Sequence, residues 1–185
     1  MTSLRYGIIA VLVGLLSSQA ASPPGREFRI EAGRVGNLLV GMRASTVMKL
    51  YPSWAIQGAF VYGEGIAAPV LEVRLARDQK KPSLSIGLGE TSDHRFTIVR
   101  GIDVLDPRFR TATGIGPGSP ISDLRAAFRD LSIESFEDHT ILNSKAMHMS
   151  FEIEYDSSLY EKDGQFKPIG ALPADIPVIS VWVYN

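Results

Sequence analysis

The side chains best suited to proton transfer in this chain are its three histidines, His94, His139 and His148. Imidazole changes charge near neutral pH, so histidine is a common general acid or base. Asp93 precedes His94 and Asp138 precedes His139, but neighbouring side chains on an extended chain point in opposite directions. The adjacent carboxylate therefore does not orient the ring. We expect these two histidines to lie in polar surface loops rather than in a catalytic site.

His148 lies between two methionines, and Met-His-Met is a pattern of copper-handling proteins because thioethers suit Cu(I). Segment 147–155 has the composition of a β-strand. On a strand, Met147 and Met149 share one face and His148 points to the other, so the three side chains do not converge on one ion. The pattern therefore predicts core methionines and no metal site.

Acidic side chains recur along the same predicted strand, at Glu152, Glu154 and Asp156. Such a face could bind a cation or a partner, but charged faces are usually the solvent side of a half-buried sheet. We therefore expect a solvated edge here. An active site made only of carboxylates, as in glycosidases, leaves no sequence motif. A hydrolase of that kind is the alternative to a binding protein.

Basic and aromatic residues could form an interface. A basic cluster at a predicted hairpin tip consists of Arg74, Arg77, Lys80 and Lys81. Arginine is enriched in protein interfaces, yet a charged tip is usually simply solvated. Trp54 and Trp182 are expected in the core or at the edge of a layer rather than as stacking platforms for sugars.

Motifs for phosphate, dinucleotide or acyl chemistry are absent from the sequence. The glycine-rich segments 87–90 (GLGE) and 116–119 (GPGS) complete neither a P-loop nor a dinucleotide fingerprint, and no serine lies in a G-x-S-x-G elbow. The chain has no cysteine, which excludes disulfides, thiolate metal sites, iron–sulfur clusters and a cysteine nucleophile. We therefore predict no catalytic, cofactor-binding or metal-binding residue and no cofactor, and we favour a protein that is not an enzyme.

The N-terminal residues 1–20 have the pattern of a secretory signal peptide. Arg5 gives a positive start, residues 7–16 (GIIAVLVGLL) form an apolar run too short for a membrane span, and Ser18 and Ala20 suit a cleavage site. We expect cleavage after Ala20, with an uncleaved N-terminal anchor as the alternative.

Location and partner follow from the rest of the composition. No later apolar run reaches the length of a membrane helix, so we expect a soluble periplasmic or secreted protein without stable membrane insertion after cleavage. The missing cysteine excludes a lipoprotein. A net charge of −1 argues against a nucleic-acid partner. The expected partner is another envelope or extracellular protein.

The chain also matches itself at three places in the same order. Segments 38–51 and 115–128 align at an offset of 77, which pairs Gly41 with Gly118. Just upstream, residues 28–29 and 109–110 (FR in both) align at an offset of 81, and segments 99–104 and 178–183 align at 79. These matches predict an internal duplication. The first repeat would span 21–105 and the second 106–185, packed either as two units or as one compact domain.

Each predicted repeat begins with a glycine turn and a short helix. In the second copy Ser119 is the expected N-cap, and Leu124, Ala127 and Phe128 supply an apolar face. In the first copy Val47, Leu50 and Tyr51 do so, and a proline follows. Predicted strands then follow at 58–62, 70–76, 84–88 and 96–104 in the first copy, and at 133–136, 147–155 and 178–184 in the second. This order predicts an α+β fold of two pseudo-symmetric repeats, each a short helix followed by an antiparallel meander.

Segments 40–47 (VGMRASTV) and 117–124 (PGSPISDL), with the strands after each, resemble the repeated unit of the secreted β-lactamase inhibitor proteins. They are also similar to the single unit of the small outer-membrane assembly lipoproteins of the SmpA/BamE type. The chain departs from both, because it lacks the acylated cysteine of the lipoproteins and the disulfides of the inhibitors. The resemblance implies the architecture and, by analogy, a role in binding other proteins. It assigns no binding residue and no inhibitory activity.

Two classes of function therefore remain, a non-catalytic protein- or ligand-binding module and a hydrolase with a carboxylate-based site. The largest pocket should discriminate between them. Two carboxylates about 5 to 10 Å apart beside an exposed aromatic would favour a glycosidase-like enzyme. A broad open sheet face with arginines and aromatics would favour a binding platform.

Overall fold

The computed structural model describes residues 25–63, 66–95, 97–136 and 139–185. The predicted signal peptide and its cleavage site lie outside these residues, as do Phe96 and Asp138. Within the described part of the chain, no helix is long and apolar enough to cross a membrane.

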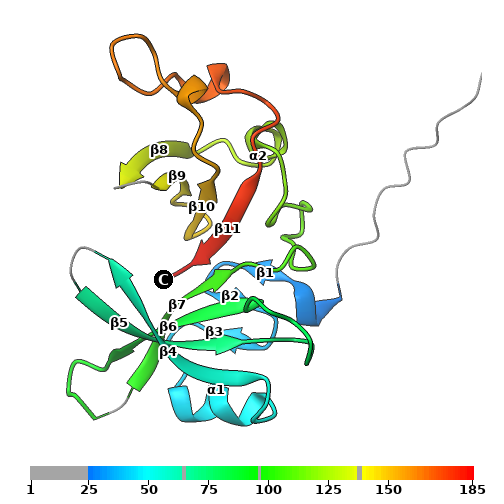
Figure 1. Cartoon of the computed structure of the whole chain (residues 1–185), viewed down its shortest axis with the longest axis vertical. Coiled ribbons are helices and arrows are strands. Elements are labelled where there is room, and N and C mark those ends of the chain that lie inside the picture. The colour runs from blue at the N-terminus through cyan, green and yellow to red at the C-terminus, as the bar shows by residue number, and fades with distance from the viewer. Residues whose placement is uncertain (1–24, 64–65, 96, 137–138) are drawn as a thin grey trace, which may run out of the picture.

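Two short helices and an eight-stranded sheet form most of the fold (Figure 1). The helices are α1 (Ala44–Leu50) and α2 (Ile121–Ala127). The strands after α1 are β4 (Ile56–Gly63), β5 (Ile66–Val73), β6 (Leu84–Glu90) and β7 (Thr97–Val104). The strands after α2 are β8 (Leu131–Phe136), β9 (His139–Ser144), β10 (Met149–Ile153) and β11 (Val178–Val183). The predicted α+β class is confirmed.

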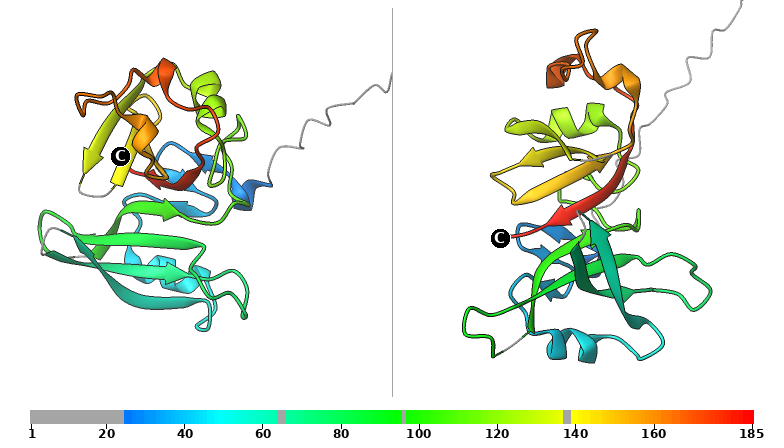
Figure 2. Two further views of the ribbon diagram at one scale, coloured as in Figure 1. Left: turned by 45° about the horizontal axis from the view of Figure 1, so that its top comes forward. Right: turned by 60° about the vertical axis from the view of Figure 1, so that its left-hand side comes forward.

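The order of the strands in the sheet is β4-β5-β6-β7-β11-β10-β9-β8, and every neighbouring pair is antiparallel. The two sets of four strands therefore join where β7 pairs with β11. Figure 2 shows that the two sets are inclined to one another about this junction. The strand β11 pairs with β7 through three residues, with Trp182 opposite Asp103.

Smaller elements complete the fold. A three-stranded sheet is formed by β1 (Ile30–Glu31), β2 (Arg34–Val35) and β3 (Leu38–Leu39). Three 3-10 turns are η1 (Arg26–Phe28), η2 (Ser157–Leu159) and η3 (Ile169–Ala171).

One core joins both sets of strands and both helices. The strands alternate, so that Ile102 and Val104 of β7 and Val181 of β11 are fully buried on one face of the sheet. Val47 of α1 and Leu124 of α2 are buried in the same cluster, as is the small sheet. The helices therefore cover one face, and residues between the buried ones, such as Asp103, point to the other face.

The helices begin and end close to where their sequences predict, with two corrections. Pro120, not Ser119, is the N-cap of α2, and it forms no side-chain cap. The Ser119 hydroxyl instead accepts a hydrogen bond from the Gly116 backbone N–H at 3.1 Å. Leu50 was expected on the apolar face of the first helix but is 44% exposed, because only one turn of this short helix contacts the core.

The strand predictions also differ from the structure in several places. The small strands β1, β2 and β3 were not predicted, and β5 runs over Ile66–Val73 rather than 70–76. The strand β9 was not predicted, because the polar sequence around His139 reads as a loop. Segment 147–155 is a strand only over Met149–Ile153, since His148 has a φ of 51° in the preceding turn. Tyr155 lies beyond the end of β10 and is 61% exposed.

Candidate functional site

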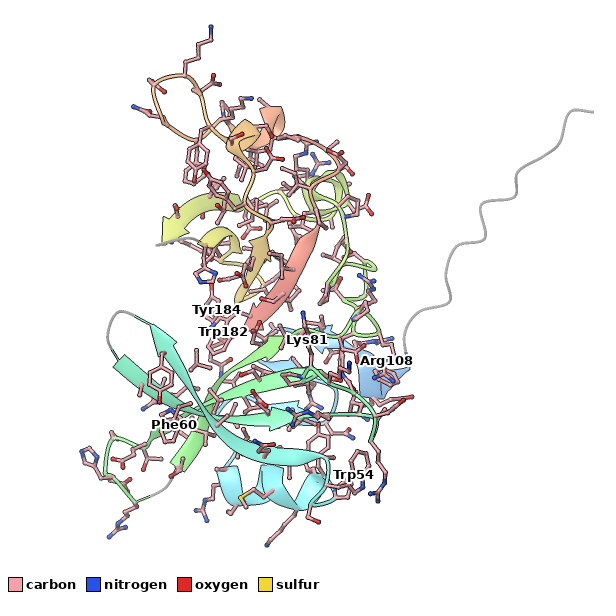
Figure 3. All side chains as sticks on the ribbon, viewed as in Figure 1. Trp54, Phe60, Lys81, Arg108, Trp182 and Tyr184 are labelled. Carbon is pink, nitrogen blue, oxygen red and sulfur yellow. The ribbon has the colours of Figure 1, made fainter. Side chains whose placement is uncertain are left out.

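A larger pocket, of about 460 Å³, has Asp123 as its single carboxylate and no aromatic lining residue, so it does not have the expected pair of carboxylates. The pocket that brings two carboxylates together beside an aromatic ring is smaller, about 170 Å³, and lies on the sheet face opposite the helices, at the junction of the two sets of strands. Its walls come from β7, β9, β10 and β11, and are formed by Asp103, His139, Ile141, Ser150, Glu152, Ser180 and Trp182. Figure 3 shows Trp182 in the space between the upper and lower strands.

Strand alternation and register bring these side chains together. Trp182 of β11 lies opposite Asp103 on one side and opposite Ser150 on the other. Glu152 of β10 lies opposite Ser180 and, across the next strand pair, opposite Ile141. They share the non-core face, because the residues next to them in each strand are buried, except Ile179 beside Ser180.

Glu152 is at the centre of a hydrogen-bonded chain. Its Oε1 lies 2.5 Å from Nδ1 of His139, and its Oε2 accepts a hydrogen bond from the Ser180 hydroxyl at 3.0 Å. This result corrects two expectations. His139 is the first residue of β9 rather than part of a loop, and Glu152 lies on an interior strand rather than on a solvated edge.

Asp103 is the second carboxylate of the pocket and is mostly buried. Burial is the largest influence and raises its pKa to about 6, a hydrogen bond from Ser180 lowers it, and the nearby charge of Glu152 raises it further. The Oδ1 atom of Asp103 is buried and accepts no hydrogen bond from any described residue. A hydroxyl carries one hydrogen, so Ser180 cannot donate to both carboxylates at once.

Trp182 forms the aromatic wall of the pocket and lies flat on the sheet. A Cβ atom added to Gly101 would lie 2.2 Å from Cζ2 of this ring, and one added to Gly87 would lie 3.0 Å from Cη2. Gly87 and Gly101 are paired across β6 and β7, so together they provide the space that the indole fills. The ring belongs neither to the core nor to an open platform.

Polar residues continue on both sides of the pocket. Cross-strand partners form one row over all eight strands, in the order Gln57, Glu72, Ser85, Asp103, Trp182, Ser150, Asn143 and Ser132. Ser150 and Asn143 are hydrogen-bonded to each other. Trp182 is the only aromatic member of the row, so the pocket interrupts an otherwise polar sheet face.

The other candidate functional residues do not line the pocket. His94 is exposed and pairs with Glu90 at 2.6 Å. Met149 is a fully buried core residue, as expected, while His148 packs edge-on against Tyr184. The described residues contain no group of three or more potential metal ligands among His, Asp and Glu.

The basic cluster and Trp54 form local contacts. The Arg77 guanidinium lies 4.8 Å from the ring centre of Trp54, which is 40% exposed rather than part of the core. Arg74 forms an ion pair with Glu72 at 3.1 Å. These arginines therefore have intramolecular partners.

Chemically, the pocket offers two carboxylates, one hydroxyl donor, an imidazole at its edge and an aromatic wall. It has hydrogen-bond acceptors in excess of donors and an acidic character. The sequence signal for it was weak, because its residues come from four strands.

Comparisons with known proteins concern the fold. No protein-family model matches the chain, and no curated protein matches it. Among solved structures, the chain is similar to the uncharacterized protein YfeY from Escherichia coli, with a TM-score of 0.50 and 15% sequence identity. The match covers 85% of this chain and 97% of that chain. At this identity the similarity shows a shared fold alone.

Proposed function

We propose that this protein is an exported, non-catalytic binding module that holds a partner on the polar face of its sheet. The observation that carries the proposal is the pocket around Asp103 and Trp182. It combines a buried, unpartnered carboxylate oxygen with a fixed aromatic wall in an otherwise polar sheet face. Buried polar groups without partners are rare in folded proteins and need an explanation, and a ligand is one.

Size and access favour binding over catalysis. Pockets for small-molecule ligands usually enclose about 300–1,000 Å³, whereas this one encloses about 170 Å³. It therefore suits one side-chain-sized group of a larger partner. Both oxygens of Glu152 already interact with His139 and Ser180, and Oδ1 of Asp103 is out of reach of solvent. Neither carboxylate therefore has both of its oxygens open to the pocket.

The proposed architecture is a duplication of one helix-and-meander unit, similar to the β-lactamase inhibitor proteins. Gly41 donates its N–H to the Val99 carbonyl, and Gly118 donates to the Val178 carbonyl. In both places the residue after the glycine accepts a hydrogen bond back from the valine. The two glycines have φ angles of 87° and 86°. These equivalent contacts, at the positions aligned from the sequence, support two copies of one unit.

A crosslinking experiment tests the binding role. A photo-reactive amino acid is placed at Ile141 on the pocket wall and, as a control, at the exposed Met48 on α1, in the organism that encodes the protein. We expect one discrete crosslinked partner from position 141, its loss in Asp103→Asn, and no such product from position 48. Absence of a product from position 141 in native envelopes would contradict the proposal.

Export is tested by the N-terminus of native material. If residues 1–20 are a cleaved signal peptide, intact-mass measurement of protein from the envelope or medium should give a chain that begins at Ala21. A chain that retains residues 7–16 would show that the apolar run is an anchor instead.

One observation favours the alternative, a carboxylate-based hydrolase. Asp103, with its pKa near 6, lies beside Glu152 and an aromatic ring, and such a pair can supply a general acid and a nucleophile. A screen with aryl glycosides and esters addresses it. Turnover that is abolished separately by Asp103→Asn and by Glu152→Gln, in variants that remain folded, would replace the binding proposal with this one.

A further inference from the structure

We propose that the group held in the pocket is an alkylammonium ion, such as the end of a lysine side chain supplied by a partner protein. This inference rests on the proposed binding function and names the chemistry of its ligand. Charge, hydrogen bonding, the aromatic wall and size each support it independently.

Charge is the first argument. Two carboxylates, Asp103 and Glu152, line the same small pocket, and no lysine or arginine is among its described lining residues. The influence of Glu152 on Asp103 shows that the two charges act on each other. Asp103 attracts a cation in this partly buried site and repels an anion, and Glu152, whose oxygens already contact His139 and Ser180, adds to both effects.

Hydrogen bonding is the second argument. The Ser180 hydroxyl is the one donor that the pocket shares between Glu152 and Asp103, and Oδ1 of Asp103 accepts no hydrogen bond from any described residue. An ammonium group brings three hydrogen-bond donors and no acceptor, and donors are what the pocket lacks. Because Asp103 lines the pocket, an ammonium group there can donate to the part of its carboxylate that faces the pocket.

The aromatic wall is the third argument. The Trp182 ring lies over the glycine pair Gly87 and Gly101, which leaves the space that the ring fills, and it lines the pocket. A cation beside a tryptophan face gains attraction from the ring quadrupole, and the methylene groups of a lysine pack on the same surface. Ile141 supplies a second apolar contact for such a chain.

Size distinguishes the ammonium from larger cations. A volume of about 170 Å³ accommodates a single extended side chain but not a whole drug-sized molecule. The two carboxylates come from separate strands, β7 and β10, and neither offers two open oxygens side by side, because both oxygens of Glu152 are hydrogen-bonded and Oδ1 of Asp103 is buried. A compact ammonium with tetrahedral donors fits that arrangement better than a planar guanidinium does.

The test uses a series of small ligands of similar length on the intact protein. Fluorescence of Trp182 is followed in a Trp54→Phe background during titration with butylammonium, 1-butanol, butyrate and methylguanidinium. We expect saturable binding of butylammonium, at least about tenfold weaker binding of the neutral and guanidinium probes, and none of butyrate. Equal binding of butanol and butylammonium would overturn the inference.

Variants then locate the site. Asp103→Asn keeps the shape of the side chain and should weaken butylammonium binding by about tenfold or more. Asp175→Asn removes the same charge from an exposed loop position and should change it by less than about twofold. Unchanged binding in Asp103→Asn would overturn the inference, and the wild-type ligand series decides it if that variant does not fold.

The source of the ammonium is tested with the same readout. Nα-acetyl-lysine-methylamide represents a protein side chain and spermidine represents a free amine. Tighter binding of the lysine derivative supports a protein partner. A preference for spermidine would overturn the assignment of the ammonium to a protein side chain. If no ammonium probe binds while the Ile141 crosslink to a partner forms, the ligand chemistry is wrong and the binding function stands. If both fail, the proposed function fails too.

Discussion

Asp103 and Asp106 lie three residues apart in sequence, and the fold shifts their pKa values in opposite directions. Burial raises the pKa of Asp103 to about 6. Hydrogen bonds from Arg108 lower the pKa of Asp106 to about 2, against the opposing effect of its own burial. The difference lies in the donors. Asp106 receives three hydrogen bonds from Arg108 and one from Ser83, whereas one oxygen of Asp103 receives none.

The first prediction concerns the pH dependence of stability through Asp103. Its folded pKa lies above the unfolded value of 3.8, so the folded state binds the proton more tightly between these values. The free energy of unfolding should therefore fall, by up to about 3 kcal/mol, as the pH rises from 4 towards 6 and beyond. Asp103→Asn should flatten this part of the profile. Urea unfolding at half-unit pH steps measures both slopes, and parallel profiles would contradict the prediction.

Asp106 should behave in the opposite way. Its folded pKa lies below the unfolded value, so its contribution is present above pH 4 and is lost as the pH falls towards 2. Asp106→Asn should lower the free energy of unfolding by about 2 kcal/mol at pH 7. Asp78→Asn, at an exposed turn, serves as the control and should change it by less than about 0.5 kcal/mol. Chemical denaturation of the three proteins side by side gives the comparison.

At the scale of elements, the sequence predicted both helices and most of the strands. Turn glycines, prolines and alternating apolar residues indicate them directly. It missed β9, and the reason is visible in its side chains. The buried face of this strand carries Thr140 and Ser144 beside Leu142, so its inward and outward residues do not differ in polarity. Where hydroxyl groups are buried, the alternation that predicts a strand disappears.

The pocket could not be predicted, because β9, the strand that was missed, supplies two of its lining residues, His139 and Ile141. His139 and Glu152 are thirteen residues apart and meet only through the register of β9 and β10. Asp103 comes from the other set of strands. His139 and Glu152 were considered as candidates from the sequence. Their contact depends on the pairing register of the strands, which the composition of each strand does not reveal.

The glycine pair under Trp182 gives a prediction for the sheet. A Cβ at position 101 would overlap the indole, so Gly101→Ala should displace the ring and lower the free energy of unfolding by about 1–3 kcal/mol. Gly58 also lies in a strand, but a Cβ there meets nothing within 4 Å. Gly58→Ala should therefore change stability by less than about 0.5 kcal/mol. Denaturation and Trp182 fluorescence in a Trp54→Phe background report the two effects, and equal outcomes would contradict the packing argument.

At the scale of the whole molecule, the two sets of strands are packed together. They share one hydrophobic core and meet through β7 and β11. The segments before the helices also pair with each other, since Ile30 donates to the Arg110 carbonyl and Arg110 donates to the Phe28 carbonyl. A half of the chain would expose the apolar side of the junction, so we expect the two proposed repeats to be stable only together.

The last prediction tests whether the two proposed copies use their turns in the same way. Gly41 and Gly118 both adopt a left-handed conformation, and a Cβ added to either would meet nothing within 4 Å. Only the backbone conformation then opposes a side chain. Gly41→Ala and Gly118→Ala should each lower the free energy of unfolding by about 1 kcal/mol, and asparagine should cost less than alanine at both positions. Urea unfolding of the four variants measures this. If the loss in free energy of unfolding at one glycine exceeded that at the other by more than about 1 kcal/mol, the two turns would contribute differently to stability. A duplicated unit does not predict such a difference.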